Sequence, residues 1–167
     1  KYNLQRGGFI MMDDRLFRDA MGKFATGVTV ILTETEGEPH GMTANAFMSV
    51  SLTPKLVVIS IKENARMLAK IQDSKKFSVN ILAENQEDIS KIFAGQIKDQ
   101  QVSFERLADV PVIPGALAQV SCEVSAEYIE GDHTLFIGKV NDITITDGDP
   151  LLYFAGKYRN LSTLVEA

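Results

Sequence analysis

The sequence has one cysteine and two histidines among 167 residues, and both scarcities exclude whole classes of site. Cys122 has no partner within the chain for a disulfide, and no CxxC motif for zinc or redox chemistry is present. Because His40 and His133 are the only histidines, a multi-histidine metal site cannot form within one chain. We therefore expect no bound metal, and we expect Cys122, which lies in an alternating strand pattern, to be a small buried core residue.

The chain also lacks an excess of positive charge and any long apolar run. Its net charge is −5, whereas a nucleic-acid surface needs clustered Lys and Arg, so we expect no nucleic-acid partner and no membrane patch. No apolar run approaches the ~20 residues of a membrane span, and a reducing cytoplasm is the expected compartment. Met11 or Met12, followed by acidic residues, resembles a natural start, so we expect residues 1–11 to be an N-terminal extension or an artificial tail.

Several common enzyme motifs are missing as well. No GxGxxG follows a strand pattern, so a Rossmann nucleotide site is unsupported, and no GxxxxGK[ST] phosphate loop occurs. The GxSxG nucleophile elbow is absent. Acidic residues are frequent in the predicted loops, but none of them has a distinctive setting.

The sequence does contain a series of strand patterns and a few short helices. Strict alternation from Ala118 to Tyr128 predicts a strand with one buried face, and a turn at Glu130–Asp132 leads into a second strand. Gly138 within that second strand predicts a bulge or a close approach of another group. The predicted helices cover 13–24, 65–72 (capped by Asn64) and the region of 89–93 (ended by Gly95). The predicted strands cover 28–33, 40–47, 56–61, 77–82, 118–128, 134–140, 143–146 and 151–158. An extended pattern resumes at 49–52 after the second of them, and 99–114 is irregular. About seven or eight strands without a regular βαβ repeat favour an antiparallel or mixed barrel that carries helices.

A polar cluster interrupts these strands. The segments Gly41–Phe47 and Ser49–Leu52 place small hydroxyl and amide groups close together, and such groups can hydrogen-bond the edge of a planar heterocycle. Ala44 and Ala46 would let a ring approach the backbone. Ordinary polar positions in a half-exposed strand explain the same composition, so the residues alone leave both interpretations open.

Two further features, the segment before the second predicted helix and His133, fit either a binding role or an ordinary structural one. The junction from Ser60 to Asn64 leads into a helix N-terminus, whose free N–H groups, with Lys62 and Arg66, suit a phosphate. An ordinary capped helix with solvated charges fits the same residues. His133 lies at a hairpin turn, where a histidine is usually just exposed.

Five segments taken together carry a resemblance to a known family. They are Thr26–Val30, Gly41–Leu52, Val79–Leu82, Gly131–His133 and Pro150–Tyr158. They resemble the flavin reductase family, and more narrowly the small reductase component of two-component hydroxylases that act on phenol or 4-hydroxyphenylacetate. The match runs in order from about residue 12 to residue 161, and its long second segment is the specific part.

This resemblance implies a fold and an assembly. The fold would be mainly β with short helices, a split β-barrel of the FMN-binding, flavin reductase-like type. It would occupy residues 12–162, followed by a C-terminal tail at 163–167. The barrel would work as a homodimer, with flavin bound near the subunit interface.

The resemblance also implies binding residues. The isoalloxazine and ribityl chain would be surrounded by Met42, Thr43, Ala44, Asn45, Ser49, Val50, Ser51 and Leu52, the phosphate would lie near Ser60, Lys62 and Arg66, and the rest of the flavin would be bordered by Asn80, Phe93, Ala94 and Gly95. The nicotinamide nucleotide would be met by Gly41, His133, Phe154 and Tyr158. Ala46 stands where many relatives have Ser, which leaves the choice between FMN and FAD open.

The implied activity is that of an NAD(P)H-dependent flavin reductase. A hydride would pass from nicotinamide C4 of NADH or NADPH to N5 of FMN or FAD, so the cofactors carry the chemistry and the protein orients them. His133 would position the dinucleotide, and no side chain need act as acid or base. Reduced flavin would then diffuse to the oxygenase of an aromatic-ring monooxygenase, and the absence of an Arg-rich pocket motif favours NADH.

Three other functions fit the same residues. The chain could be a flavin reductase that serves ferric iron or another acceptor. It could instead be a flavin- or haem-binding barrel without nicotinamide-dependent activity, acting as a carrier or sensor, and then replacing His133 by Ala would change nothing. A purely structural dimerisation domain would bind no cofactor.

Overall fold

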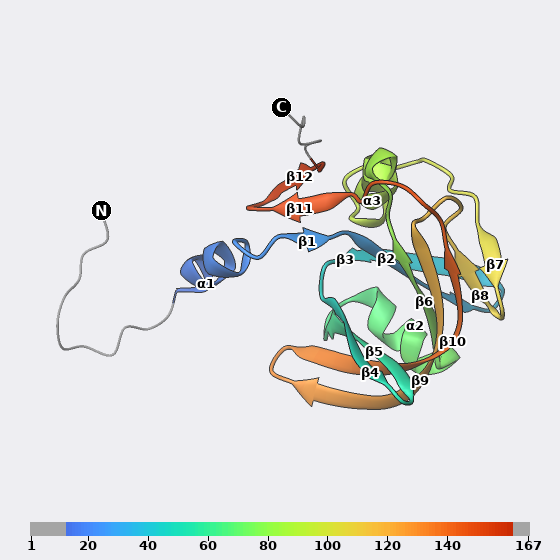
Figure 1. Ribbon diagram of the computed structural model, residues 1–167. Helices are drawn as coiled ribbons and strands as arrows, with labels where there is room; N and C mark the ends of the chain where they lie inside the picture. Colours follow the sequence, from blue (N-terminus) through green and yellow to red (C-terminus); the bar gives the residue numbers. More distant parts are fainter. Residues whose placement is uncertain (1–12, 162–167) are drawn as a thin grey trace, which may run out of the picture.

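The computed structural model describes residues 13–161, which form a mainly β fold with short helices, as predicted (Figure 1). The helices are α1 (Asp14–Met21), α2 (Arg66–Ser74), the 3-10 turn η1 (Glu84–Gln86) and α3 (Glu87–Phe93). The strands are β1 (Thr26–Gly27), β2 (Thr29–Thr35), β3 (Glu38–Ala44), β4 (Phe47–Leu52), β5 (Lys55–Lys62), β6 (Lys76–Ile81), β7 (Glu105–Leu107), β8 (Val110–Val112), β9 (Ala118–Glu130), β10 (His133–Ile145), β11 (Leu152–Phe154) and β12 (Lys157–Arg159). The expected extension at 1–11 and tail at 163–167 lie outside the described residues.

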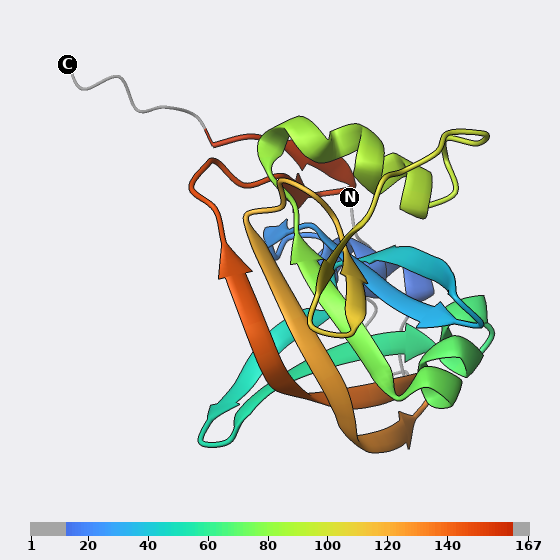
Figure 2. The same cartoon turned by 90° about the vertical axis from the view of Figure 1, so that its right-hand side faces the viewer.

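The main sheet closes on itself. It has seven antiparallel strands in the order β3-β2-β6-β9-β10-β5-β4. The two edge strands, β3 and β4, follow each other in the sequence and are joined only by Asn45 and Ala46. Because two residues cannot span a flat sheet of this width, with strands ~4.8 Å apart, the sheet curls until its edges meet at these residues (Figure 2). The predicted barrel is confirmed.

The long hairpin of β9 and β10 forms the middle of this sheet. Its register shifts between Ile137 and Gly138, and a Cβ on Gly138 would lie 2.5 Å from Cζ of Phe77 and 3.0 Å from Cβ of Cys122. The bulge and the close approach predicted at Gly138 are therefore both present. Cys122 is fully buried as expected, and burial raises the pKa of its thiol to about 12.

Two apolar clusters hold the elements together. The larger fills the barrel and includes Met67 and Ile71, which α2 places against the sheet. The smaller lies under α3 and the C-terminal hairpin, where Leu82, Leu151 and neighbouring side chains are buried. The predicted helix cap is wrong, because Ala65 is the N-cap of α2 and no side chain caps that end.

Two segments contain more strand than the sequence predicts. The irregular segment 99–114 includes the short hairpin of β7 and β8. The single strand expected over 151–158 is a hairpin of β11 and β12 whose turn, Ala155 and Gly156, has φ values of 49° and 79°. Positive φ at both turn residues gives a two-residue hairpin turn, and nothing but Gly156 signals it in the sequence. In the same way the strand expected over 40–47 ends at Ala44, where the chain turns the barrel corner.

Helix α1 stands apart from the barrel in Figure 1. It is amphipathic as predicted, although it ends at Met21, and none of its residues is buried. Leu16, Phe17 and Met21 expose about half of their surfaces, so its apolar stripe faces solvent in a single chain. Within residues 13–161 no helix combines the length and the apolar character that a bilayer crossing requires.

Candidate functional site

The corner between β3 and β4 carries the polar block of the sequence. Ala44 is buried at the end of β3, whereas Asn45 and Ala46 are exposed. The corner is fixed by its backbone, because the N–H of Phe47 donates to the carbonyl of Asn45 at 2.9 Å and the N–H of Ser60 donates to the carbonyl of Ala46 at 3.2 Å. Small residues on a fixed backbone leave main-chain groups within reach of a flat ligand.

Before and after the corner, the predicted residues differ in exposure. Met42, on β3, packs half-buried against the barrel core. On β4, the second edge strand, Ser49 is exposed and Ser51 half-buried, and Val50 and Leu52 expose 47% and 86% of their surfaces. This edge strand therefore offers hydroxyl groups and an uncovered apolar strip side by side.

The end of β5 brings a second group of predicted residues together. Lys62 pairs across the sheet with His133 at the start of β10, and Ser60 pairs with Leu135. Asp132 contacts both side chains, since its Oδ1 lies 2.8 Å from His133 Nδ1 and its Oδ2 lies 3.9 Å from Lys62 Nζ. The His133 hydrogen bond is the main cause of a lowered pKa at the Asp132 carboxyl, and Lys62 adds a smaller effect.

The same contact determines the state of the histidine ring. An ionised carboxylate accepts hydrogen bonds and cannot donate, so Nδ1 of His133 carries the proton that faces Asp132. In the neutral ring this leaves Nε2 as an acceptor. The turn is fixed further by Glu63, whose N–H donates to the Asp132 carbonyl at 3.0 Å and whose carboxylate accepts from the Thr134 hydroxyl.

The N-terminus of α2 follows directly on this group. Arg66 is its first residue and is exposed, as is Lys62 at the end of β5. No side chain caps the helix, and of its first N–H groups that of Leu68 donates to the carbonyl of Ala65 at 3.1 Å.

Helix α3 lies against the other side of the corner. The Thr43 hydroxyl donates to the carbonyl of Ser90 at 2.6 Å, and Oγ of Ser90 lies 2.8 Å from Oη of Tyr158 on β12. Phe93 covers Gly41, where an added Cβ would lie 2.6 Å from its ring. Ala94 caps the helix, and Gly95 follows with a φ of 73°.

The structure separates some of the residues predicted to share a ligand. The β11–β12 hairpin, which carries Phe154 and Tyr158, and the turn before His133 lie at opposite ends of the molecule in Figures 1 and 2, and Figure 1 shows the corner between them. Asn80 lies inside the core without exposed surface. Its amide donates to the Val30 carbonyl at 2.9 Å and accepts from the N–H of Ile113 at 2.8 Å, so it ties elements together beneath the corner.

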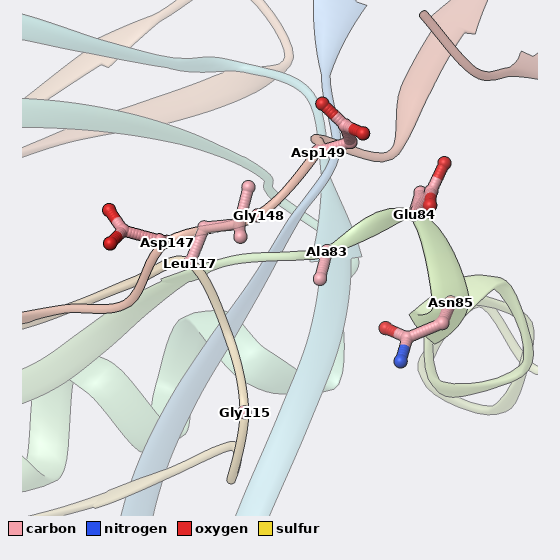
Figure 3. A pocket seen from close by; sticks show the side chains of 8 residues that line it. All are labelled: Ala83, Glu84, Asn85, Gly115, Leu117, Asp147, Gly148 and Asp149. Carbon is pink, nitrogen blue, oxygen red and sulfur yellow. The ribbon is translucent and has the colours of Figure 1, made fainter.

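A surface hollow of about 230 Å³ lies elsewhere (Figure 3). It is lined by Ala83, Glu84, Asn85, Gly115, Leu117, Asp147, Gly148 and Asp149. None of these residues was predicted for the site, and the three exposed carboxylates repel an anionic phosphate. Asp147 and Asp149 point in different directions in Figure 3, and within residues 13–161 no group of three or more His, Cys, Asp or Glu side chains is placed to hold a metal ion.

Sequence reasoning missed three residues that organise these groups. Asp132 orients His133, and the Gly131–His133 motif contained it without showing its role. Ser90 and Glu63 each connect two elements that lie far apart in the sequence. No local pattern distinguishes such residues from solvated ones, because their partners are set by the fold.

The chain matches a known protein family over most of its length. The family model described as "Flavin reductase like domain" matches residues 21–162. An NADH-dependent flavin reductase from a Rhodococcus species is 44% identical over 151 residues, which cover 88% of this chain and 86% of that protein. The reductase component of the 4-hydroxyphenylacetate 3-monooxygenase of Thermus thermophilus is 39% identical over 146 residues, covering 87% of this chain and 95% of that protein.

Solved structures agree with this match. The structure of flavin reductase PheA2 in its native state superimposes with a TM-score of 0.90 at 64% identity, covering 91% of this chain and all (100%) of that chain.

Proposed function

This chain belongs to the flavin reductase-like domain family, and from that membership we propose that it is an NAD(P)H:flavin oxidoreductase that supplies reduced FMN or FAD to the oxygenase of a two-component monooxygenase. The observation that carries the proposal is the family match over residues 21–162, which includes the corner and the Gly131–His133 turn. The Rhodococcus relative, named NADH-dependent, supports NADH as the donor. The Thermus relative, named a monooxygenase reductase component, supports an oxygenase partner.

The corner fits a flavin. Asn45 offers an exposed amide to the polar edge of the ring, and Ala46 lets the ring approach the fixed backbone. Ser49 and Ser51 add hydroxyl groups for the ribityl chain. When bound, the flavin accepts a hydride from the reduced nicotinamide and passes its electrons on.

The phosphate end of the flavin fits the junction of β5 and α2. Lys62 and Arg66 are exposed there, and the first N–H groups of α2 have no side-chain cap. A phosphate bound at this place receives hydrogen bonds from the helix end together with charge from two cations. The corner and this junction are continuous, because the Ser60 N–H on β5 bonds the Ala46 carbonyl.

The nicotinamide nucleotide is positioned without acid–base chemistry. Asp132 fixes the ring of His133 so that Nε2 accepts a hydrogen bond, which suits the amide donor of a carboxamide. Because the C-terminal hairpin lies at the opposite end of the molecule from His133, Phe154 and Tyr158 would contact a different part of the same dinucleotide. The chain contributes orientation of two ligands, which is sufficient for hydride transfer between cofactors.

A second copy of the chain covers the exposed apolar surfaces. Phe17 of α1 exposes 53% of its surface, and Met48 and Leu52 of β4 expose 59% and 86%. Surfaces of this kind on an amphipathic helix and an edge strand are typical of a subunit interface. The homodimer therefore places an interface beside the flavin corner, and we place the enzyme in the cytoplasm, where reduced flavin reaches the oxygenase by diffusion.

Anaerobic spectroscopy tests the proposed activity. The purified protein is mixed with FMN or FAD, NADH or NADPH is added, and the visible flavin absorbance is followed. We expect rapid bleaching, well above a protein-free control, with NADH preferred. Flavin binding without bleaching would instead identify a carrier or sensor, and neither binding nor bleaching would limit the family likeness to the fold.

His133 provides the matching mutational test. His133→Ala removes the oriented hydrogen-bond acceptor, so we expect the KM for NADH to rise about tenfold, the value of one good hydrogen bond, while the flavin Kd changes less than about twofold. Glu130→Ala, an exposed change on the same turn, is the control and should leave both constants unchanged. An unchanged KM in His133→Ala would remove His133 from the nicotinamide site.

A further inference from the structure

Ser90 occupies a position that no part of the proposed function uses. Its side chain is fully buried on α3, and it faces two different groups. Its backbone carbonyl accepts the Thr43 hydroxyl at 2.6 Å, while its own hydroxyl lies 2.8 Å from Oη of Tyr158. One residue thus connects the flavin corner, through its main chain, and the C-terminal hairpin, through its side chain.

The C-terminal hairpin is attached mainly through β11 and the residues beside it, since the backbone of Leu151 bonds Leu82 and Val28 and the N–H of Ala155 donates to the carbonyl of Gly22. In its sheet the order is β1-β11-β12, so β12 is the outer strand and its backbone pairs with β11. β11 in turn pairs with β1 over two residues, Thr26 and Gly27. The Tyr158 hydroxyl therefore provides the polar link from β12 to the body of the protein.

The ring of Tyr158 is held in one orientation. Its centroid lies 5.3 Å from that of Tyr153 in an edge-to-face contact, and Nζ of Lys91 lies 5.9 Å from it. A ring packed in this way directs its hydroxyl at Ser90, and the hydrogen bond fixes how far β12 stands from α3. Since the Ser90 carbonyl also accepts the Thr43 hydroxyl, Ser90 is the residue through which hydrogen bonds connect β12 with the corner, in addition to the apolar packing of Tyr158.

We propose that Ser90 is a positioning residue for the nicotinamide nucleotide: its hydroxyl fixes Tyr158 and thereby the hairpin that contacts the donor. The inference rests on the proposed function, in which Tyr158 meets the nicotinamide nucleotide. The two hydrogen bonds of Ser90 can be tested separately, because the bond to Thr43 uses the Ser90 carbonyl, which a side-chain substitution retains. Loss of the Ser90 hydroxyl therefore affects the donor and spares the flavin.

The test compares KM for NADH with Kd for flavin. In Ser90→Ala we expect the KM for NADH to rise about three- to tenfold, as for the loss of one hydrogen bond, and the flavin Kd to stay within about twofold. Tyr158→Phe removes the same hydrogen bond without touching the buried serine and should give the same change. The double variant should be no worse than either single one, because one bond is lost in all three. Ser125→Ala, an exposed serine on β9, is the control.

The outcomes separate this inference from the proposed function. If wild-type protein reduces flavin but both single variants keep its KM for NADH, Ser90 has no positioning role. Equal weakening of flavin and NADH, or additive effects in the double variant, would also overturn the inference, since a general loss of structure moves both constants. If Ser90→Ala does not fold, Tyr158→Phe decides alone. A wild-type protein that leaves flavin oxidised removes the proposed function, and this inference with it.

Discussion

His40, on β3, has a cationic neighbour that determines its protonation. Its Nε2 lies 2.8 Å from Nζ of Lys70 on α2, and the same ammonium lies 3.4 Å from Oγ1 of Thr35. Partial burial, first, and the Lys70 charge, second, lower the pKa of His40 from its ordinary value of 6.5, against a weaker opposing effect of Glu38. The neutral ring is therefore the form that the folded protein favours, and it accepts a hydrogen bond from Lys70.

A lowered histidine pKa makes stability depend on pH. The unfolded chain takes up a proton near pH 6.5, before the folded protein does, so stability is complete above this pH and is lost as the pH falls through the folded pKa. We expect the free energy of unfolding in urea to fall as the pH drops below about 6.5, and to fall less in His40→Asn, which does not titrate. Lys70→Met should reduce the dependence only in part, since burial remains. Equal slopes in wild type and His40→Asn would contradict this assignment.

At the residue scale, the sequence predicts which residues form the candidate site better than it predicts the hydrogen bonds that link them. The corner, Lys62 and His133 were identified from residue types and from the family resemblance, and the structure brings Lys62 and His133 side by side. Asn80 fits the same resemblance but lies in the core, because its amide is used by Val30 and Ile113. Ser90 could not be found, since its partners are 47 and 68 residues away in the chain.

At the scale of elements, Gly138 allows the long hairpin to lie against the core. Its missing side chain leaves room for Phe77, whose ring would be 2.5 Å from an added Cβ. Phe77 is fully buried, so the ring has no free space to occupy. The bulge beside Gly138 and the packing of β6 against β9 therefore depend on one small residue.

We expect Gly138→Ala to lower the free energy of unfolding by about 1–3 kcal/mol, the usual cost of overpacking a core. Urea denaturation measures it, with flavin absent. Gly27→Ala is the control, because an added Cβ there meets no atom within 4 Å. The same loss in both variants would mean that the effect comes from backbone flexibility and not from Phe77.

Elements with a strong period were predicted well, and short ones were not. The alternation of β9 predicts a strand, and the structure confirms the strand. The single buried face is wrong, because Gln119 and Ser121 are buried as well as Val120 and Cys122, whereas Tyr128 is exposed. The core accepts the Gln119 amide because that amide donates to the carbonyl of Ile113. By contrast β7, β8 and β12 have three residues each, too few for a period to be visible. Their pairing depends on turns and on the surfaces beneath them, which a single sequence does not display.

At the scale of the whole molecule, the exposed stripe of α1 predicts the assembly. No residue of α1 is buried in one chain, and in the proposed homodimer the helix would gain its apolar contacts from the second copy. We expect sedimentation velocity at micromolar concentration to show a dimer for the wild type and a monomer for Phe17→Glu, which places a charge in the stripe. Arg18→Glu, on the polar face of the same helix, should remain dimeric. A monomeric wild type, or a dimer in both variants, would contradict this interface.

The meeting of β3 and β4 at a two-residue corner has a consequence for folding. Three of the six strand pairings between those edges, β2 with β6, β6 with β9 and β5 with β10, join segments far apart in the chain, and pairings of this kind form slowly. The corner takes its final shape only when the last of them is made. A ligand that needs the completed corner binds the folded protein and not partly folded chains. By mass action it therefore shifts the folding equilibrium toward the completed barrel. The supply of flavin in the cell would then govern how long each newly made chain survives proteolysis, as well as what it reduces.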